Sequence, residues 1–208
     1  MNMVKPMEKI EVKNPGQHYV DKWIIYDALD GPAIDENKWS LKVTGLVNKP
    51  AEYTYKELNK MPGIEYISDF NCVTKWSIRD AKFTGPSLKD IIMKSEPSPE
   101  AEWVMFVCAD GYDTPIPFND AIDDKSILAL KIDDKPLGVK HGFPARPFMP
   151  SLYGWKSAKW VTEIKLMEKY EDGYWEAYGY HERGRVDEQE RFKGFEWKKI
   201  RRHSEVDK

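Results

Sequence analysis

Residues 141–160 read HGFPARPFMPSLYGWKSAKW. Between its prolines and glycines, this stretch gathers the basic side chains His141, Arg146, Lys156 and Lys159, with Ser157 between the two lysines. Pro and Gly stiffen a loop, so its donors are expected to be preorganised. A forked guanidinium, an ammonium and a hydroxyl together suit a phosphate group. The alternative is a solvated loop whose charges bind nothing, and the residues alone leave both open.

Cys72 and Cys108 are the two cysteines of the chain. They show no C-x-x-C spacing, which excludes a zinc knot and a thioredoxin motif. Cys72 lies in DFNCVTKW (69–76), where a predicted strand ends; it is either a small buried hydrophobe or a thiolate, with Lys75 and Arg79 near in sequence to supply positive charge. Cys108 lies at the end of an apolar run, so a place in the core or in the wall of a pocket is favoured over a role as a direct ligand.

Composition excludes several classes of protein. The 208 residues carry 32 basic and 35 acidic side chains, so a net charge of −3 argues against a globally basic nucleic-acid binder. We find no apolar run long enough to cross a membrane, and the start MNMVKPMEKIEVKNPG shows no leader pattern, so the expected location is cytoplasmic. Neither G-x-G-x-x-G nor a Walker A motif is present.

Aromatic residues are abundant, with eight Trp, eleven Tyr and eight Phe. Several gather in DGYWEAYGYHERG (172–184). Such rings either fill a core or wall a pocket for a flat cofactor, and composition does not decide between these.

Hydrophobic patterning predicts one α+β domain over residues 1–208, rich in strands and loops. Strands are expected at 39–47, 64–70, 103–108, 127–132 and 157–168, with 114–118 as an edge strand or loop. Thr54 and Glu57 form a capping-box pattern for one short helix, and a second is expected at 87–94. Residues 23–28 read as a short buried run, 136–154 as a long structured loop, and 169–208 as mostly irregular chain.

Four segments fall in an order that resembles the molybdopterin-binding domain of the sulfite oxidase family. They are DFNCVTKW, CADGYDTPIPF (108–118), HGFPARPFMPSLYGWKSAKW and DGYWEAYGYHERG. The resemblance covers roughly residues 15–192 and is greatest to prokaryotic single-domain enzymes related to the catalytic subunit of the methionine sulfoxide reductase. It implies the sulfite oxidase fold, built on mixed β-sheets with short helices, and a molybdenum-molybdopterin cofactor.

Carried over residue by residue, the resemblance implies a set of site residues. Cys72 would coordinate molybdenum, a soft ligand on a metal that is also bound by the pterin's dithiolene sulfurs. Tyr180 would lie at the substrate face of the metal. The remaining matches contact the cofactor: Tyr26, Asp27, Cys108 or its neighbour Ala109, His141 and Arg146 at the pterin, and Ser157, Ala158 and Lys159 at its phosphate end.

The sequence also departs from the family. Sulfite oxidases follow the metal cysteine with a C-x-G-N-R-R type sequence whose arginine binds the anionic substrate, whereas Val73-Thr74-Lys75-Trp76 follow here. An aromatic residue at that position favours a neutral or apolar substrate, such as a sulfoxide, over sulfite. The haem and dimerisation domains of the animal and plant enzymes have no counterpart, so electrons are expected to pass to or from a separate protein.

The resulting hypothesis is a molybdopterin-dependent oxidoreductase that transfers an oxygen atom between water and a small substrate. Two alternatives remain at this point. One is a related domain that binds the cofactor without catalysis. The other is an interaction module that uses its aromatic residues and the basic tail at 191–203 to bind RNA or protein.

Overall fold

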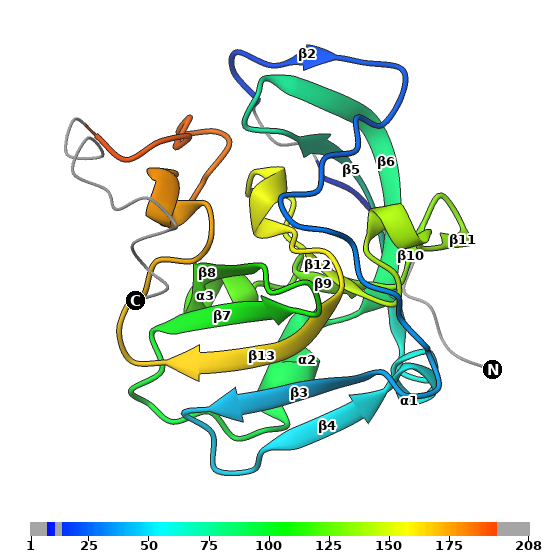
Figure 1. Ribbon diagram of the computed structural model, residues 1–208, viewed down its shortest axis with the longest axis vertical. Helices are drawn as coiled ribbons and strands as arrows, with labels where there is room; N and C mark the ends of the chain where they lie inside the picture. Colours follow the sequence, from blue (N-terminus) through cyan, green and yellow to red (C-terminus); the bar gives the residue numbers. More distant parts are fainter. Residues whose placement is uncertain (1–7, 11–13, 195–208) are drawn as a thin grey trace.

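The computed structural model describes residues 8–10 and 14–194 of the chain. Within these residues the strands form two larger β-sheets and one small ladder, joined by helices of at most six residues (Figure 1). The expected architecture of mixed sheets with short helices is therefore confirmed. Most of the basic tail that the interaction-module hypothesis used, from residue 195 onward, lies outside the described residues.

The first sheet carries the loop that presents Cys72. Its strands run in the order β1-β5-β6-β10-β11, with β2 also paired to β6. β5 and β6 pair antiparallel and are connected through that loop. The strands are β1 (Glu8–Ile10), β2 (His18–Tyr19), β5 (Gly63–Asn71), β6 (Trp76–Pro86), β10 (Lys131–Ile132) and β11 (Lys135–Pro136).

The second sheet runs in the order β4-β3-β13-β7-β8, with β13 parallel to β3 and antiparallel to β7. Leu41 and Val43 on β3 are fully buried, as the alternation at 39–47 predicts. The proline-containing strand β8 lies at the sheet edge, as expected. The strands are β3 (Ser40–Gly45), β4 (Ala51–Thr54), β7 (Trp103–Cys108), β8 (Asp113–Pro117) and β13 (Val161–Met167).

A two-stranded ladder of β9 (Ile127–Ala129) and β12 (Arg146–Phe148) contributes Arg146 to the site. The strand expected at 127–132 is thus divided between β9 and β10. β6 passes very close to β9 at Gly85, where an added Cβ would meet the Leu128 carbonyl oxygen at 1.8 Å. Phe148 stacks on Phe83 of β6 with ring centroids 3.7 Å apart, which fixes the ladder against the first sheet.

The helices begin where the sequence places their caps. The Thr54 side chain accepts from the Glu57 backbone N–H and the Glu57 carboxylate accepts from that of Thr54, so the predicted capping box is confirmed. Ser87 caps the second helix through the Asp90 N–H at 3.2 Å. The helical segments are α1 (Tyr55–Leu58), α2 (Leu88–Met93), α3 (Phe118–Ala121), η1 (Val139–His141), η2 (Gly154–Lys156) and η3 (Glu176–Tyr178).

Two predictions about local structure are wrong, and several short elements and the long strand β6 were not predicted. Residues 23–28 do not form a buried run, because Ile24 and Tyr26 are 51% and 68% exposed. The strand expected from residue 157 begins only at Val161, since Trp160 takes a left-handed conformation with φ 57°. β6 was not predicted because a register shift near Asp80, whose φ is 51°, interrupts its alternation.

Candidate functional site

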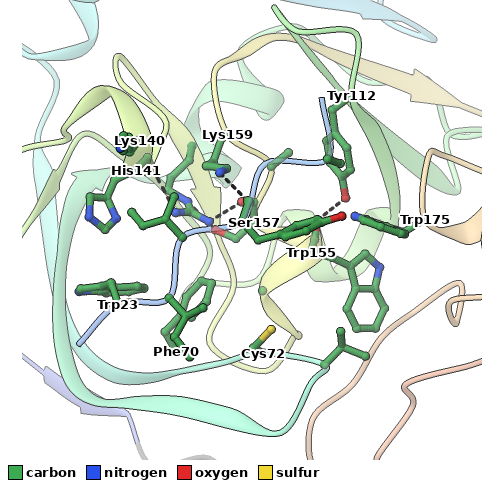
Figure 2. A pocket seen from close by; sticks show the side chains of 18 of the residues that line it. Trp23, Phe70, Cys72, Tyr112, Lys140, His141, Trp155, Ser157, Lys159 and Trp175 are labelled. Carbon is green, nitrogen blue, oxygen red and sulfur yellow. Dashed lines mark hydrogen bonds between the residues drawn. The ribbon is translucent and has the colours of Figure 1, made fainter. Parts of the chain in front are cut away.

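A cavity of about 360 Å³ is lined by residues from distant parts of the chain (Figure 2). The Cys72 loop, the 23–28 segment and the 140–160 stretch all contribute to its wall. The lining includes eight of the ten residues that the family resemblance singles out: Tyr26, Cys72, His141, Arg146, Ser157, Ala158, Lys159 and Tyr180. Among these eight, residues up to 154 positions apart in sequence, Tyr26 and Tyr180, are therefore brought together around one space.

Arg146 is a buried cation with uncharged partners. Its guanidinium donates to Ser157 Oγ at 3.0 Å, to the Ser157 carbonyl at 2.6 Å and to the His141 carbonyl at 3.2 Å. Burial lowers its pKa to about 10, so the group still carries its charge at neutral pH. No ion pair joins it to a carboxylate of the described residues. A buried charge of this kind is normally paired, so the arrangement fits an anionic ligand in the cavity.

His141 and Lys140 extend this basic side of the cavity. The His141 ring lies 5.3 Å from the Trp23 ring, and burial lowers its pKa, with the Arg146 charge lowering it further. The imidazole is therefore neutral at pH 7 and can either donate or accept one hydrogen bond at each nitrogen.

Lys159 ties the 23–28 segment to the cavity wall. Its ammonium forms an ion pair with the Asp27 carboxylate and donates to the Tyr26 carbonyl at 2.8 Å. Asp27 itself is not among the lining residues and reaches the site through this pair. The segment predicted to be a short buried run is thus mostly exposed and forms part of the cavity wall.

Ser157 and Ala158 belong to the segment that connects η2 to β13. Ser157 accepts from Arg146 Nε and donates to the Pro147 carbonyl at 2.5 Å, so its hydroxyl is fixed in orientation. Ala158 is buried and also lines the cavity. Both residues lie on the same side as Arg146, where the resemblance places the phosphate end of the cofactor.

Cys72 lies across the cavity from these cations (Figure 2). It follows the last residue of β5, and its Sγ is 3.2 Å from Thr74 Oγ1. The neighbouring residues in the cavity wall carry no charge at neutral pH. They are Val73 and Thr74, which follow Cys72 in the sequence, and Trp155 and Tyr180, which belong to the same cluster. The thiol therefore lies at an apolar end of the cavity, opposite a basic end.

Tyr180 is held within a cluster of rings. It stacks on Trp175 with centroids 5.0 Å apart and meets Trp155 edge-on at 5.2 Å. Burial raises the pKa of its phenol, so the hydroxyl stays protonated and can donate a hydrogen bond. Of the two interpretations of the aromatic composition, these rings follow the second and wall a pocket.

Cys108 and Lys156 lie elsewhere. Cys108 is buried in the core of the second sheet and is not a lining residue; burial raises the pKa of its thiol. Two residues further, Asp110 does face the cavity, although the sequence indicated only a turn at Asp110-Gly111. Lys156 is fully buried and pairs with Glu176 at 2.6 Å, so it is not part of the phosphate-binding set suggested by its neighbours in sequence.

The described residues contain no group of three or more His, Cys, Asp or Glu side chains arranged to hold a metal ion. Cys72 could thus supply one protein ligand, with the cofactor's own sulfurs supplying others. Cationic and hydroxyl donors at one end, a thiol at the other and aromatic walls between them fit the phosphate, metal and pterin of molybdopterin. No helix in the described part of the chain is long and apolar enough to cross a membrane.

Comparisons with known proteins identify relatives of the chain. It is 35% identical to the uncharacterized oxidoreductase YuiH of Bacillus subtilis over 86% of this chain and 90% of that protein. It is 30% identical to the protein-methionine-sulfoxide reductase catalytic subunit MsrP of Xanthomonas campestris, over 66% of this chain but only 47% of that protein.

The fold has a counterpart among solved structures. The sulfane dehydrogenase SoxCD of Paracoccus pantotrophus matches with a TM-score of 0.62 at 22% identity, over 67% of this chain and 40% of that one. The family model described as the oxidoreductase molybdopterin-binding domain matches residues 28–175. The chain is therefore a member of this family of molybdopterin-dependent oxidoreductases, to which sulfite oxidase also belongs.

Proposed function

We propose that the protein holds a molybdenum-molybdopterin cofactor in this cavity and transfers an oxygen atom between water and a small uncharged substrate, such as a sulfoxide. The observation that carries the proposal is the polarity of the cavity. Arg146, a buried cation that forms no ion pair with a carboxylate of the described residues, faces one end, and the Cys72 thiol lies among uncharged side chains at the other.

Each part of the chain has a task in this proposal. Arg146, Ser157 and Lys159 would hold the phosphate end, with Ala158 packed beside it, and His141 would contact the pterin. Cys72 would ligate the metal. The bound cofactor would supply the two-electron chemistry, while the protein supplies position and electrostatics.

Tyr180 would orient the substrate. Its protonated phenol lies in the cavity wall and packs beside Cys72 and Trp155. A phenol can donate one hydrogen bond to a polarised substrate oxygen, and this would orient that oxygen toward the Cys72 end of the cavity, where the metal would be held. The stacked Trp175 keeps the ring from rotating away, because such a stack resists reorientation.

The selection against anions follows from desolvation. Sulfite entering the Cys72 end would lose water without gaining a cation from the lining residues there, and unpaired charge in an apolar site is costly. We therefore expect a methyl aryl sulfoxide, reduced with a dye donor, to give a kcat/KM at least about 100-fold above that for sulfite oxidation. Steady-state assays of the molybdenum-loaded protein with both substrates measure this ratio.

A designed variant sharpens that test. Thr74 is exposed, lines the cavity and lies close to the Cys72 sulfur, so Thr74→Arg places a guanidinium at the apolar end. The variant is expected to raise sulfite turnover and lower sulfoxide turnover. A wild-type protein that prefers sulfite would refute the proposed substrate class.

The electron partner and the cellular location belong to the same proposal. We expect a separate redox protein to exchange electrons with the site; a relative at 30% identity, YedZ1 of Azospira oryzae, is described as a putative protein-methionine-sulfoxide reductase subunit. The cytoplasmic location indicated by the sequence stays a prediction.

A further inference from the structure

The loop that presents Cys72 is closed by its own backbone. The Cys72 N–H donates to the Trp76 carbonyl at 2.9 Å, and the Lys75 N–H donates to the Cys72 carbonyl at 3.1 Å. Lys75 takes a left-handed conformation with φ 76°, which is unfavourable for a residue with a side chain. Such a turn persists only where surrounding contacts fix it.

One of these contacts comes from the N-terminal segment. Gln17 Nε2 donates to the Cys72 carbonyl at 3.0 Å. The next residue, His18, donates its backbone N–H to the Lys75 carbonyl at 2.8 Å, and β2 then pairs with β6. The N-terminal segment therefore binds both ends of the Cys72 loop.

A second contact comes from Arg191, which is only 9% exposed. Its guanidinium donates from Nη1 to the Val73 carbonyl at 2.6 Å, and from Nη2 to the Pro15 carbonyl and Gln17 Oε1, each at 3.3 Å. It also lies over the Tyr153 ring at 4.8 Å. No ion pair joins it to a carboxylate of the described residues. This cation thus donates its hydrogen bonds to two backbone carbonyls and one side-chain oxygen of the loop and the N-terminal segment.

The same C-terminal segment also carries Tyr180. The His181 N–H donates to the Arg191 carbonyl at 3.3 Å, and Tyr180 forms a β-bridge with Phe192. Val186 of this segment packs with Val73 in a small cluster under the loop. One segment therefore sets the position of the Cys72 loop and of the ring beside it.

We propose that Arg191 and Gln17 are positioning residues that fix the Cys72 loop so that its sulfur faces the cavity. Both lie outside residues 28–175, the region that the family model matches. The inference rests on the proposed role of Cys72 as the metal ligand. It assigns one task to an N-terminal and a C-terminal segment, each of which donates to the loop and which are joined by the contact between Arg191 and Gln17.

The first test compares Arg191→Ala with Arg185→Ala. Arg185 belongs to the same segment and pairs with Asp120 at 2.6 Å, so its loss removes a comparable link that does not reach the loop. The full-length protein is examined without cofactor by hydrogen exchange of the 72–76 backbone and by alkylation of Cys72 with N-ethylmaleimide. Buried Cys108 in the same chain serves as the internal reference.

Arg191→Ala should accelerate exchange and Cys72 alkylation by about tenfold, because hydrogen bonds from a charged donor to the loop are lost. Arg185→Ala should leave both rates within about twofold of the wild type, whatever its melting temperature. Arg191→Lys should keep both rates closer to those of the wild type, because the lysine ammonium can still donate to the Val73 carbonyl. Equal rates in Arg191→Ala and wild type would overturn the inference, as would equal changes in the Ala variants of Arg191 and Arg185.

Gln17→Glu gives a second, independent measurement. It keeps the oxygen that accepts from Arg191 but replaces the amide donor to the Cys72 carbonyl. Loop exchange should rise while the melting temperature is maintained, and in the molybdenum-loaded protein kcat should fall with little change in KM. Unchanged loop exchange in this variant would remove Gln17 from the proposal.

The two hypotheses fail in different ways. Loop exchange in the cofactor-free protein tests the positioning role alone, whereas activity of a Cys72 variant tests the proposed function alone.

Discussion

Replacing Lys156 by methionine is expected to lower the free energy of unfolding by about 3–5 kcal/mol. Lys156 and Glu176 are both fully buried, and the ammonium also donates to the Pro115 and Glu182 carbonyls at 2.6 and 2.5 Å. Burial lowers the pKa of the Lys156 ammonium, and the Glu176 charge opposes that shift. Removing the cation leaves a buried carboxylate whose charge is no longer balanced. Urea unfolding measures the loss.

The partners of Glu176 explain why the loss should be large. Its Oε1 also accepts from Trp155 Nε1 at 2.8 Å and Thr114 Oγ1 at 3.0 Å, while Oε2 has no hydrogen-bond partner among the described residues. Trp155 lines the cavity, so this ion pair supports the cavity wall from behind. Lys156→Met is therefore also expected to loosen the cavity.

Two controls separate burial of charge from loss of a contact. In the double variant Lys156→Met with Glu176→Gln the unbalanced charge is gone, so about half of the lost stability or more should return. Lys49→Met removes the exposed ion pair with Glu96 and should cost at most about 1 kcal/mol. A loss for Lys156→Met no larger than that for Lys49→Met would contradict the account.

Cys72→Ala and Cys72→Ser are each expected to reduce turnover by more than about 100-fold. Even the loss of a residue that only hydrogen-bonds to a metal ligand lowers metal affinity or activity by about 10–100-fold. Serine nearly keeps the volume but offers a hard oxygen in place of a soft sulfur, which suits molybdenum less well. Cys72 is only partly buried, so both variants should remain folded. Circular dichroism checks the fold, and turnover is compared with that of Lys49→Met. Wild-type turnover in Cys72→Ala would exclude this cysteine as the functional metal ligand.

Local patterns in the sequence predicted much of the second sheet. Alternation around Leu41 and Val43 identifies β3, and the Thr54–Glu57 pair identifies the start of α1, because both signals act within a few residues. The lining residues could be named only through the family resemblance. Nothing in the spacing of Cys72 and Arg146 indicates that they face the same cavity.

Features that depend on tertiary contacts could not be predicted. Lys156 and Lys159 are three residues apart in a basic stretch, yet one is buried against Glu176 and the other pairs with Asp27 at the rim. The η2 turn ends at Lys156, and the backbone leaves the helical conformation at Ser157, between the two lysines. Arg191 lay in what the sequence indicated as an irregular tail, and its partner Gln17 is 174 residues away.

The central claim is that the cavity between Arg146 and Cys72 holds a molybdenum-molybdopterin cofactor. The most direct measurement is elemental analysis for molybdenum on protein from a molybdate-fed host that makes the cofactor. Fluorescence of the oxidised pterin released on denaturation is measured on the same samples. We predict close to one molybdenum and one pterin for each chain. Absence of both in such a host would contradict the account.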